Sequence, residues 1–215
     1  MGATRREGPR LGHLPAQSCR RERWANGQGW TRVVAAGPGS PPSWRLSIAE
    51  ITSDGPFSLF PGQRRIQVLL SGDGFTLVPG EGAAPTLDPP FGQAAYDGSL
   101  VVHCRLHGGP CAALNLIWSP DRVEAQVLHR PLVGPMYVFA AAGETWLVHL
   151  AAGSATAAAD GADGPGAVLL EQGDTAVLEA GGRGGRLALE GGGDLVLLRL
   201  RSTATAGLED DQAAG

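Results

Sequence analysis

Apolar and polar residues alternate along this chain with the two-residue period of β-strands. One predicted strand carries Arg45 and Ser47 on its polar face, and a second carries Arg65 and Gln67 in the same way. Turn residues separate the runs, and no convincing window has the period of a helix. We therefore expect an all-β protein. Its predicted strands cover residues 31–34, 43–51, 65–70, 75–78, 91–97, 100–106, 112–118, 123–129, 136–141, 145–150, 167–170, 175–178, 186–189 and 195–200.

The predicted strands fall into two series, because the alternation weakens between residues 119 and 135. Two packed β-sandwich units and one double-sized jelly-roll-like body fit this pattern equally well. The Arg-, Gly- and Pro-rich start and the acidic end lack periodicity, which is typical of disordered segments. The expected organisation is a disordered segment at 1–22, a first β unit at 23–120, a second at 121–201 and a disordered acidic tail at 202–215.

Composition excludes several classes of function. The 215 residues carry a formal net charge of −4, so the chain lacks the basic footprint of a nucleic-acid-binding protein. All 17 basic residues are Arg, which excludes chemistry that requires Lys, such as a Schiff base or a P-loop. Neither a transmembrane helix nor a signal peptide is predicted. The three cysteines show no metal or redox spacing, which favours free thiols in a reducing compartment, and we expect a cytoplasmic protein.

Sequence motifs for metal binding or nucleophilic catalysis are not found. His103 and His107 flank a predicted strand, where residues four apart are separated by roughly 13 Å, too far to share one metal ion. The chain has no H-E-x-x-H motif, and no G-x-S-x-G stands between a strand and a helix. We therefore expect no metal ligand and no catalytic residue.

The polar face of the first strand series is the remaining candidate for function. It is either the solvated side of a sheet or, if the sheet curls, the lining of a pocket in which guanidinium groups bind a carboxylate. Asn115 lies among apolar residues, so we expect it to be buried with a backbone group or a ligand as its partner. Asn26 is either a turn residue or a ligand contact. The candidate ligand-binding residues are Arg45, Ser47, Arg65, Gln67, Asn115 and Asn26.

The order and spacing of several motifs resemble the HutD/Ves family. These motifs are Trp24-Ala25-Asn26-Gly27-Gln28-Gly29 with Thr31-Arg32, Trp44-Arg45-Leu46-Ser47-Ile48-Ala49, Asp54-Gly55-Pro56-Phe57-Ser58 with Phe60-Pro61-Gly62 and Arg65, Leu70-x-Gly72-x-Gly74, and more weakly Pro90-Phe91, Tyr96-Asp97-Gly98 and Leu114-Asn115-Leu116. The second half of the chain matches only as generic cupin-like strands. Two departures, Ala113 where the family usually has an acidic residue and Ile117 where it usually has Met, concern the ligand more than the fold.

The resemblance implies a bicupin, with one cupin-like barrel in each predicted unit. The cupin metal motifs are missing from this sequence, so the resemblance brings no metal with it, and we expect no cofactor. It also implies a non-catalytic protein of histidine utilisation that senses or buffers a small carboxylate, such as urocanate or N-formylglutamate. Cupins often dimerise through a sheet, so a homodimer is compatible with this reading, whereas nucleic-acid and membrane partners are not expected. Two alternatives stay open: a cupin-scaffold isomerase or oxygenase, and a stress-induced protein with a structural or interaction role. The enzyme would need acid/base groups or metal ligands in the same cavity, from His103, His107, His149 or Glu50.

Overall fold

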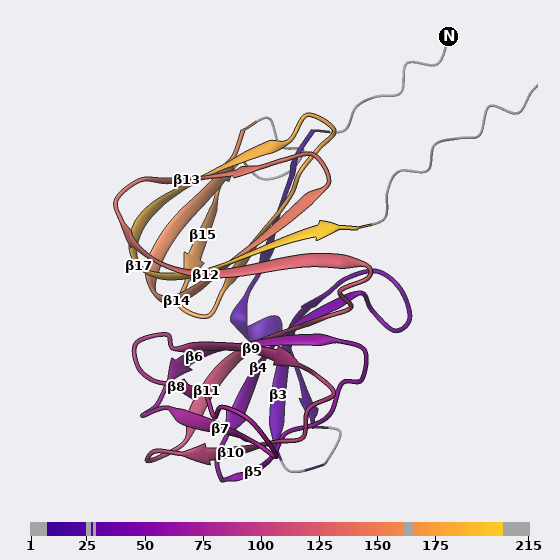
Figure 1. Cartoon of the computed structure of the whole chain (residues 1–215). Coiled ribbons are helices and arrows are strands. Elements are labelled where there is room, and N and C mark those ends of the chain that lie inside the picture. Colours follow the sequence, from indigo (N-terminus) through magenta and orange to yellow (C-terminus); the bar gives the residue numbers. More distant parts are fainter. Residues whose placement is uncertain (1–7, 25–26, 28, 161–165, 204–215) are drawn as a thin grey trace, which may run out of the picture.

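The computed structural model describes residues 8–24, 27, 29–160 and 166–203. Within these residues, the regular elements are β-strands and one short 3-10 helix, η1 (Ala16–Ser18), so the all-β prediction is confirmed. The strands form two units, which lie one above the other in Figure 1. The strands are β1 (Arg10–Leu14), β2 (Arg20–Arg23), β3 (Trp30–Ala36), β4 (Trp44–Ile51), β5 (Gly55–Pro56), β6 (Arg64–Ser71), β7 (Phe75–Pro79), β8 (Thr86–Leu87), β9 (Gln93–Asp97), β10 (Val102–Leu106), β11 (Cys111–Trp118), β12 (Val123–Val133), β13 (Met136–Ala140), β14 (Glu144–Ala159), β15 (Val168–Glu171), β16 (Thr175–Glu179) and β17 (Gly185–Ser202).

The first unit consists of a six-stranded sheet, in the order β2-β3-β4-β11-β6-β9, and a four-stranded sheet, in the order β5-β10-β7-β8. Strand β11 pairs antiparallel with both β4 and β6, so these three strands form the centre of the larger sheet. Inward side chains of both sheets meet in an apolar cluster that includes Ile51, Leu69, Phe75 and Val102. This cluster fills one end of the unit.

The second unit is a seven-stranded sheet built around the long strands β14 and β17, which pair with each other along most of their length. Its interior is filled by apolar side chains, among them Leu150, Leu178, Leu187 and Leu195. Near the register shift in the pairing of these two strands, Gly193 has a φ of 137°, and a Cβ atom there would overlap the backbone of the partner strand. Glycine is required at this position because the two backbones approach so closely.

The two units share a third apolar cluster, which lies between them. Leu46 and Leu116 contribute from the central strands of the first unit, and Leu147 and Leu198 contribute from β14 and β17. The apolar face of the first unit's large sheet is therefore covered by the second unit. Because the polar face points into the first unit, this sheet is buried on both sides.

The N-terminal segment differs from the predicted disordered segment at 1–22. Strand β1 pairs with β16 of the second unit, and β2 pairs with β3 of the first, so residues 10–23 connect the two units. The Arg-rich composition of this segment led to the prediction of disorder. Charged side chains are common on edge strands, and β2 is such a strand, so its composition does not distinguish it from a disordered segment. Residues 1–7 and all but the first two residues of the predicted tail at 202–215 lie outside the described residues. In the part of the chain that is described, no helix has the length and apolar character needed to cross a membrane.

Candidate ligand-binding site

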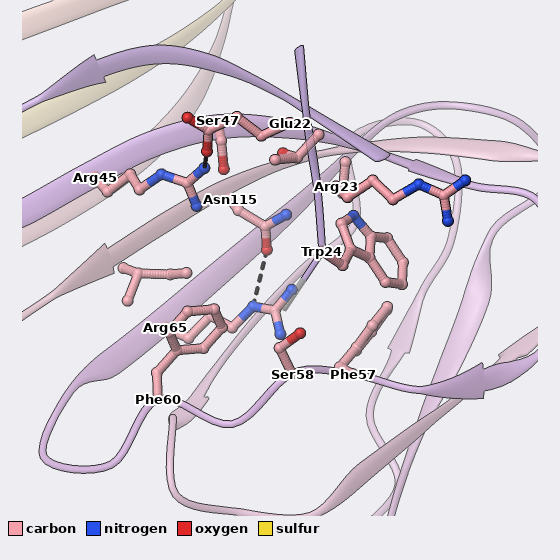
Figure 2. A pocket seen from close by; sticks show the side chains of 13 residues that line it. Glu22, Arg23, Trp24, Arg45, Ser47, Phe57, Ser58, Phe60, Arg65 and Asn115 are labelled. Atoms are coloured by element: carbon pink, nitrogen blue, oxygen red, sulfur yellow. Dashed lines mark hydrogen bonds and ion pairs between the residues drawn. The ribbon is translucent and has the colours of Figure 1, made fainter. Parts of the chain in front are cut away.

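The first unit contains a cavity of about 330 Å³ on the inner face of its large sheet. Strands β4, β6 and β11 supply one wall, and the loop between β5 and β6 supplies aromatic side chains on the other side of the cavity (Figure 2). The lining residues are Glu22, Arg23, Trp24, Thr31, Arg45, Ser47, Ala49, Phe57, Ser58, Phe60, Arg65, Asn115 and Ile117. A volume of this size falls at the lower end of the range for small-molecule sites.

Strand register explains why polar side chains gather at this wall. Residues that lie opposite one another on β4, β11 and β6 form successive rows across the sheet, and alternate rows face the interior. From the rim toward the apolar core, the inward rows are Arg45, Ile117 and Arg65, then Ser47, Asn115 and Gln67, then Ala49, Ala113 and Leu69. The last row belongs to the apolar cluster of the first unit. The interior is therefore polar at one end and apolar at the other.

Arg65 is the central charged group of the cavity. The residue is only 5% exposed, and its Nε donates a hydrogen bond of 2.9 Å to Oδ1 of Asn115. Its guanidinium carbon lies 4.7 Å from the ring centroid of Phe57, 5.6 Å from that of Tyr96 and 5.8 Å from that of Phe60. The amide and the three rings fix the position of the cation, and the rings stabilise it through their negative faces.

Among the described residues, no carboxylate lies within ion-pairing distance of the Arg65 guanidinium. Burial lowers the pKa of Arg65, while Tyr96 and Cys104 act in the opposite direction. A guanidinium nevertheless stays protonated in proteins. A buried cation without a counter-charge is costly, and this cost is relieved when an anion binds beside it.

Arg45 lines the same cavity as Arg65, but Arg45 forms an ion pair with a carboxylate of the chain. Its Nη2 lies 2.7 Å from Oε2 of Glu22 on β2, and both side chains are about one-third exposed or less. Arg20 also contacts Glu22. The carboxylate that Arg45 binds in this structure therefore comes from the chain itself.

Two hydroxyl groups and an aromatic wall complete the cavity. Ser47 is 2% exposed, and the buried Oγ of Ser58 has no hydrogen-bond partner among the residues that the structure describes. Trp24 donates from Nε1 to the carbonyl oxygen of Trp30 at 2.8 Å and packs edge-on against Phe57, with ring centroids 5.7 Å apart. The cavity thus combines hydrogen-bonding groups with a flat apolar surface, a combination suited to a small organic anion.

The structure brings together four of the six candidate residues, since Arg45, Ser47, Arg65 and Asn115 all line the cavity. Gln67 does not: it is fully buried behind the lining, and its Oε1 accepts a hydrogen bond of 2.7 Å from the hydroxyl of Tyr96. Burial raises the pKa of Tyr96 to about 12, so this hydroxyl remains a donor at neutral pH.

Asn26 lies outside the described residues. Nine of the lining residues were not among the candidates, including Glu22, Trp24, Phe57, Ser58 and Phe60. Phe57 and Phe60 belong to a motif that the sequence shares with the family it resembles. Alternation of polar and apolar residues cannot predict that side chains of this loop lie over the sheet.

The residues considered for an enzyme lie elsewhere. Glu50 pairs with Arg21 at 2.7 Å, and none of His103, His107 and His149 lines the cavity. Among the described residues, no group of three His, Cys, Asp or Glu side chains is arranged to hold a metal ion. The only carboxylate among the lining residues described here is Glu22, which is already bound to Arg45.

Comparison with known proteins agrees with this architecture. The model of a family described as HutD matches residues 16–197. This chain belongs to the HutD family. It is 41% identical over 118 residues to an uncharacterized 21.2 kDa protein in the hutC 3′ region of Pseudomonas putida, a match that covers 53% of this chain and 61% of that protein. It is 36% identical over 107 residues to protein Ves of Citrobacter koseri, covering 48% and 56%. The matched part therefore spans about three-fifths of the length of these curated relatives.

Solved structures extend the likeness to nearly the whole HutD-family chain. HutD from Pseudomonas fluorescens SBW25, determined in a formate condition, aligns with a TM-score of 0.73 and 29% identity over 89% of this chain and 98% of that chain. The oxalate decarboxylase of Lactobacillus farciminis aligns with a TM-score of 0.60 and 10% identity over 87% and 85%, which shows a shared fold alone. The predicted bicupin fold is confirmed.

Proposed function

We propose that this HutD-family protein binds a small organic carboxylate in the cavity of its first unit and acts, without catalysis, as a sensor or buffer in histidine utilisation. Urocanate and N-formylglutamate are the proposed ligands, and the cytoplasm is the proposed location. All three cysteines are free, which supports a reducing compartment. The family relation and the hutC-region relative support the link to histidine utilisation.

The observation that carries the proposal is the state of Arg65. Its guanidinium is buried, is held in place by Asn115 and three rings, and meets no carboxylate of the described residues. A ligand carboxylate beside it would provide the counter-charge and accept charge-assisted hydrogen bonds. The hydroxyl of Ser58, which lacks a partner among the described residues, could donate to the same ligand.

The cavity lining supports binding rather than catalysis. General acid–base chemistry requires a titratable group within hydrogen-bond reach of the substrate. In the described lining, the carboxylate of Glu22 is already bound to Arg45, and the histidines lie elsewhere. The remaining polar groups are guanidinium, amide and hydroxyl groups, which bind and orient an anion.

Isothermal titration calorimetry with urocanate and N-formylglutamate tests the proposal. Replacing Arg65 by Met retains much of the side-chain volume and removes the charge, so affinity should fall by at least about 30-fold, or about 2 kcal/mol. Arg64→Met is the matched control, because Arg64 is the adjacent residue on β6 and its side chain is exposed. Absence of binding heat with both acids and the wild-type protein, or an equal loss in the two variants, would refute the proposal.

A further inference from the structure

We infer that Glu22 sets the charge preference of the cavity, so that it accepts an acid with one carboxylate and disfavours a dicarboxylate. The inference rests on the proposed function of the same cavity and narrows the class of ligand. It follows from the different states of the two arginines, of which Arg65 has no counter-charge among the described residues and Arg45 is bound to Glu22.

The two guanidinium groups stand at the same level of the sheet. Arg45 on β4 and Arg65 on β6 both lie opposite Ile117 of β11, so their strands are roughly 10 Å apart, which is two strand spacings. Without Glu22, two cations would line one cavity at positions suited to the two ends of a diacid. With Glu22 in place, only the Arg65 position is open to a ligand carboxylate.

Strand pairing and two arginine contacts place Glu22 in this position. Strand β2 pairs with β3, where Glu22 lies opposite Thr31, and its carboxylate contacts both Arg45 and Arg20. A second ligand carboxylate would have to displace the Glu22 carboxylate from Arg45 or lie beside it as a like charge. Either outcome is unfavourable in a partly buried site, where charge–charge interactions are weakly screened.

A third arginine of the described lining keeps its charge, but its guanidinium points away from Arg65 and Asn115 (Figure 2). Arg23 also lines the cavity, but its Nη1 donates to the carbonyl oxygen of Gly27 at 3.0 Å and its guanidinium stacks on Trp30, 4.8 Å from the ring centroid. The surfaces of Trp24 and Phe57 favour a flat apolar body. Of the two proposed ligands, urocanate has one carboxylate on a planar body, whereas N-formylglutamate has two carboxylates on a flexible chain. The site therefore fits urocanate better.

Titration of three proteins with both acids tests the inference. The wild type should bind urocanate more tightly than N-formylglutamate. Glu22→Gln removes the negative charge and leaves Arg45 open, so the affinity for N-formylglutamate relative to urocanate should rise at least about tenfold. Glu50→Gln is the matched control, because it removes the Arg21–Glu50 pair, which has the same length of 2.7 Å but lies away from the cavity, and should leave the ratio unchanged.

A double variant tests whether Arg45 causes the gain in relative affinity for N-formylglutamate. Adding Arg45→Met to Glu22→Gln should return the ratio of affinities to the wild-type value. A wild type that prefers N-formylglutamate, or a ratio that Glu22→Gln does not change in a protein with an unaltered melting temperature, would overturn the inference while leaving the proposed function intact. If neither acid binds to the wild type, the proposed function itself fails.

Discussion

Replacing His149 by Gln should remove a large part of the acid sensitivity of this protein's stability. His149 lies on β14 with an exposed fraction of 1%, and its Nδ1 is 3.0 Å from Oγ1 of Thr175. Burial, with a smaller contribution from the positive charge of Arg32, lowers the pKa of His149 to about 4, although Asp174 acts in the opposite direction. The folded protein therefore keeps this imidazole neutral at pH values where the unfolded chain protonates it.

The magnitude follows from the difference between the two pKa values. An exposed histidine in the unfolded chain has a pKa of about 6.5, so between about pH 6.5 and pH 4 the unfolded state binds a proton that the folded state does not. The free energy of unfolding consequently rises with pH across this window. The contribution of His149 is fully present above about pH 6.5 and is lost as the pH falls to about 4. A difference of about 2.5 units corresponds to about 3 kcal/mol at pH 4.

Urea unfolding of the wild type and His149→Gln at pH 7.5 and pH 4 provides the assay. The carboxylates contribute equally to the pH dependence of the wild type and of His149→Gln. The fall in the free energy of unfolding between pH 7.5 and pH 4 should therefore be about 3 kcal/mol larger in the wild type, and this difference is due to His149. His103→Gln is the control, since the side chain of His103 is exposed on β10, and it should lose the same free energy as the wild type. If His149→Gln is as acid-sensitive as the wild type, the imidazole is not kept neutral by burial and the reasoning is wrong.

Two further predictions concern the second unit. Asp174→Asn weakens the hydrogen bond of 2.8 Å that the carboxylate accepts from the backbone N–H of Ala16. We therefore expect the free energy of unfolding in urea to fall by about 1–3 kcal/mol and hydrogen exchange in β1 to become faster. Unchanged exchange in β1 would contradict this role of Asp174. Gly193→Ala would place a Cβ against the carbonyl oxygen of Ala152 and should lower the free energy of unfolding by about 2–4 kcal/mol. Gly192→Ala is the control and should be tolerated, because its Cβ would lie 3.9 Å from its nearest neighbour. Equal melting temperatures for the two variants would refute the close approach of the strands at Gly193.

Alternation identified the residues on the polar face of the first unit's large sheet, but it could not show that this face is interior. The period of two places Arg45 and Ser47 on the opposite side of β4 from Leu46, and the structure has this arrangement. Both sides turn out to be buried, because the apolar side packs on the second unit while the polar side lines the cavity. Packing between segments far apart in the sequence decides this, and local periodicity carries no information about it.

Strand lengths in the second unit were underestimated for a different reason. Strands were predicted only at 145–150 and 167–170 in this part of the chain, yet β14 continues to Ala159, and the two strands predicted at 186–189 and 195–200 are parts of the single strand β17. The additional residues are rich in Ala and Gly, which have low intrinsic preference for strands. They extend because the long strands pair with each other, a tertiary effect that exceeds local propensity.

The contrast between the two units explains why the cavity lies in the first. The interior of the second unit is filled by leucines such as Leu150 and Leu187, whereas inward positions on the central strands of the first unit hold Arg65 and Asn115. An uncompensated buried cation lowers the stability of the unit that contains it. The first unit can tolerate this cost because the apolar face of its large sheet is packed on the second unit, through residues such as Leu116. That packing also fixes the strands that position Arg65 and Asn115, so the filled second unit supports the strands that carry the proposed anion site of the first.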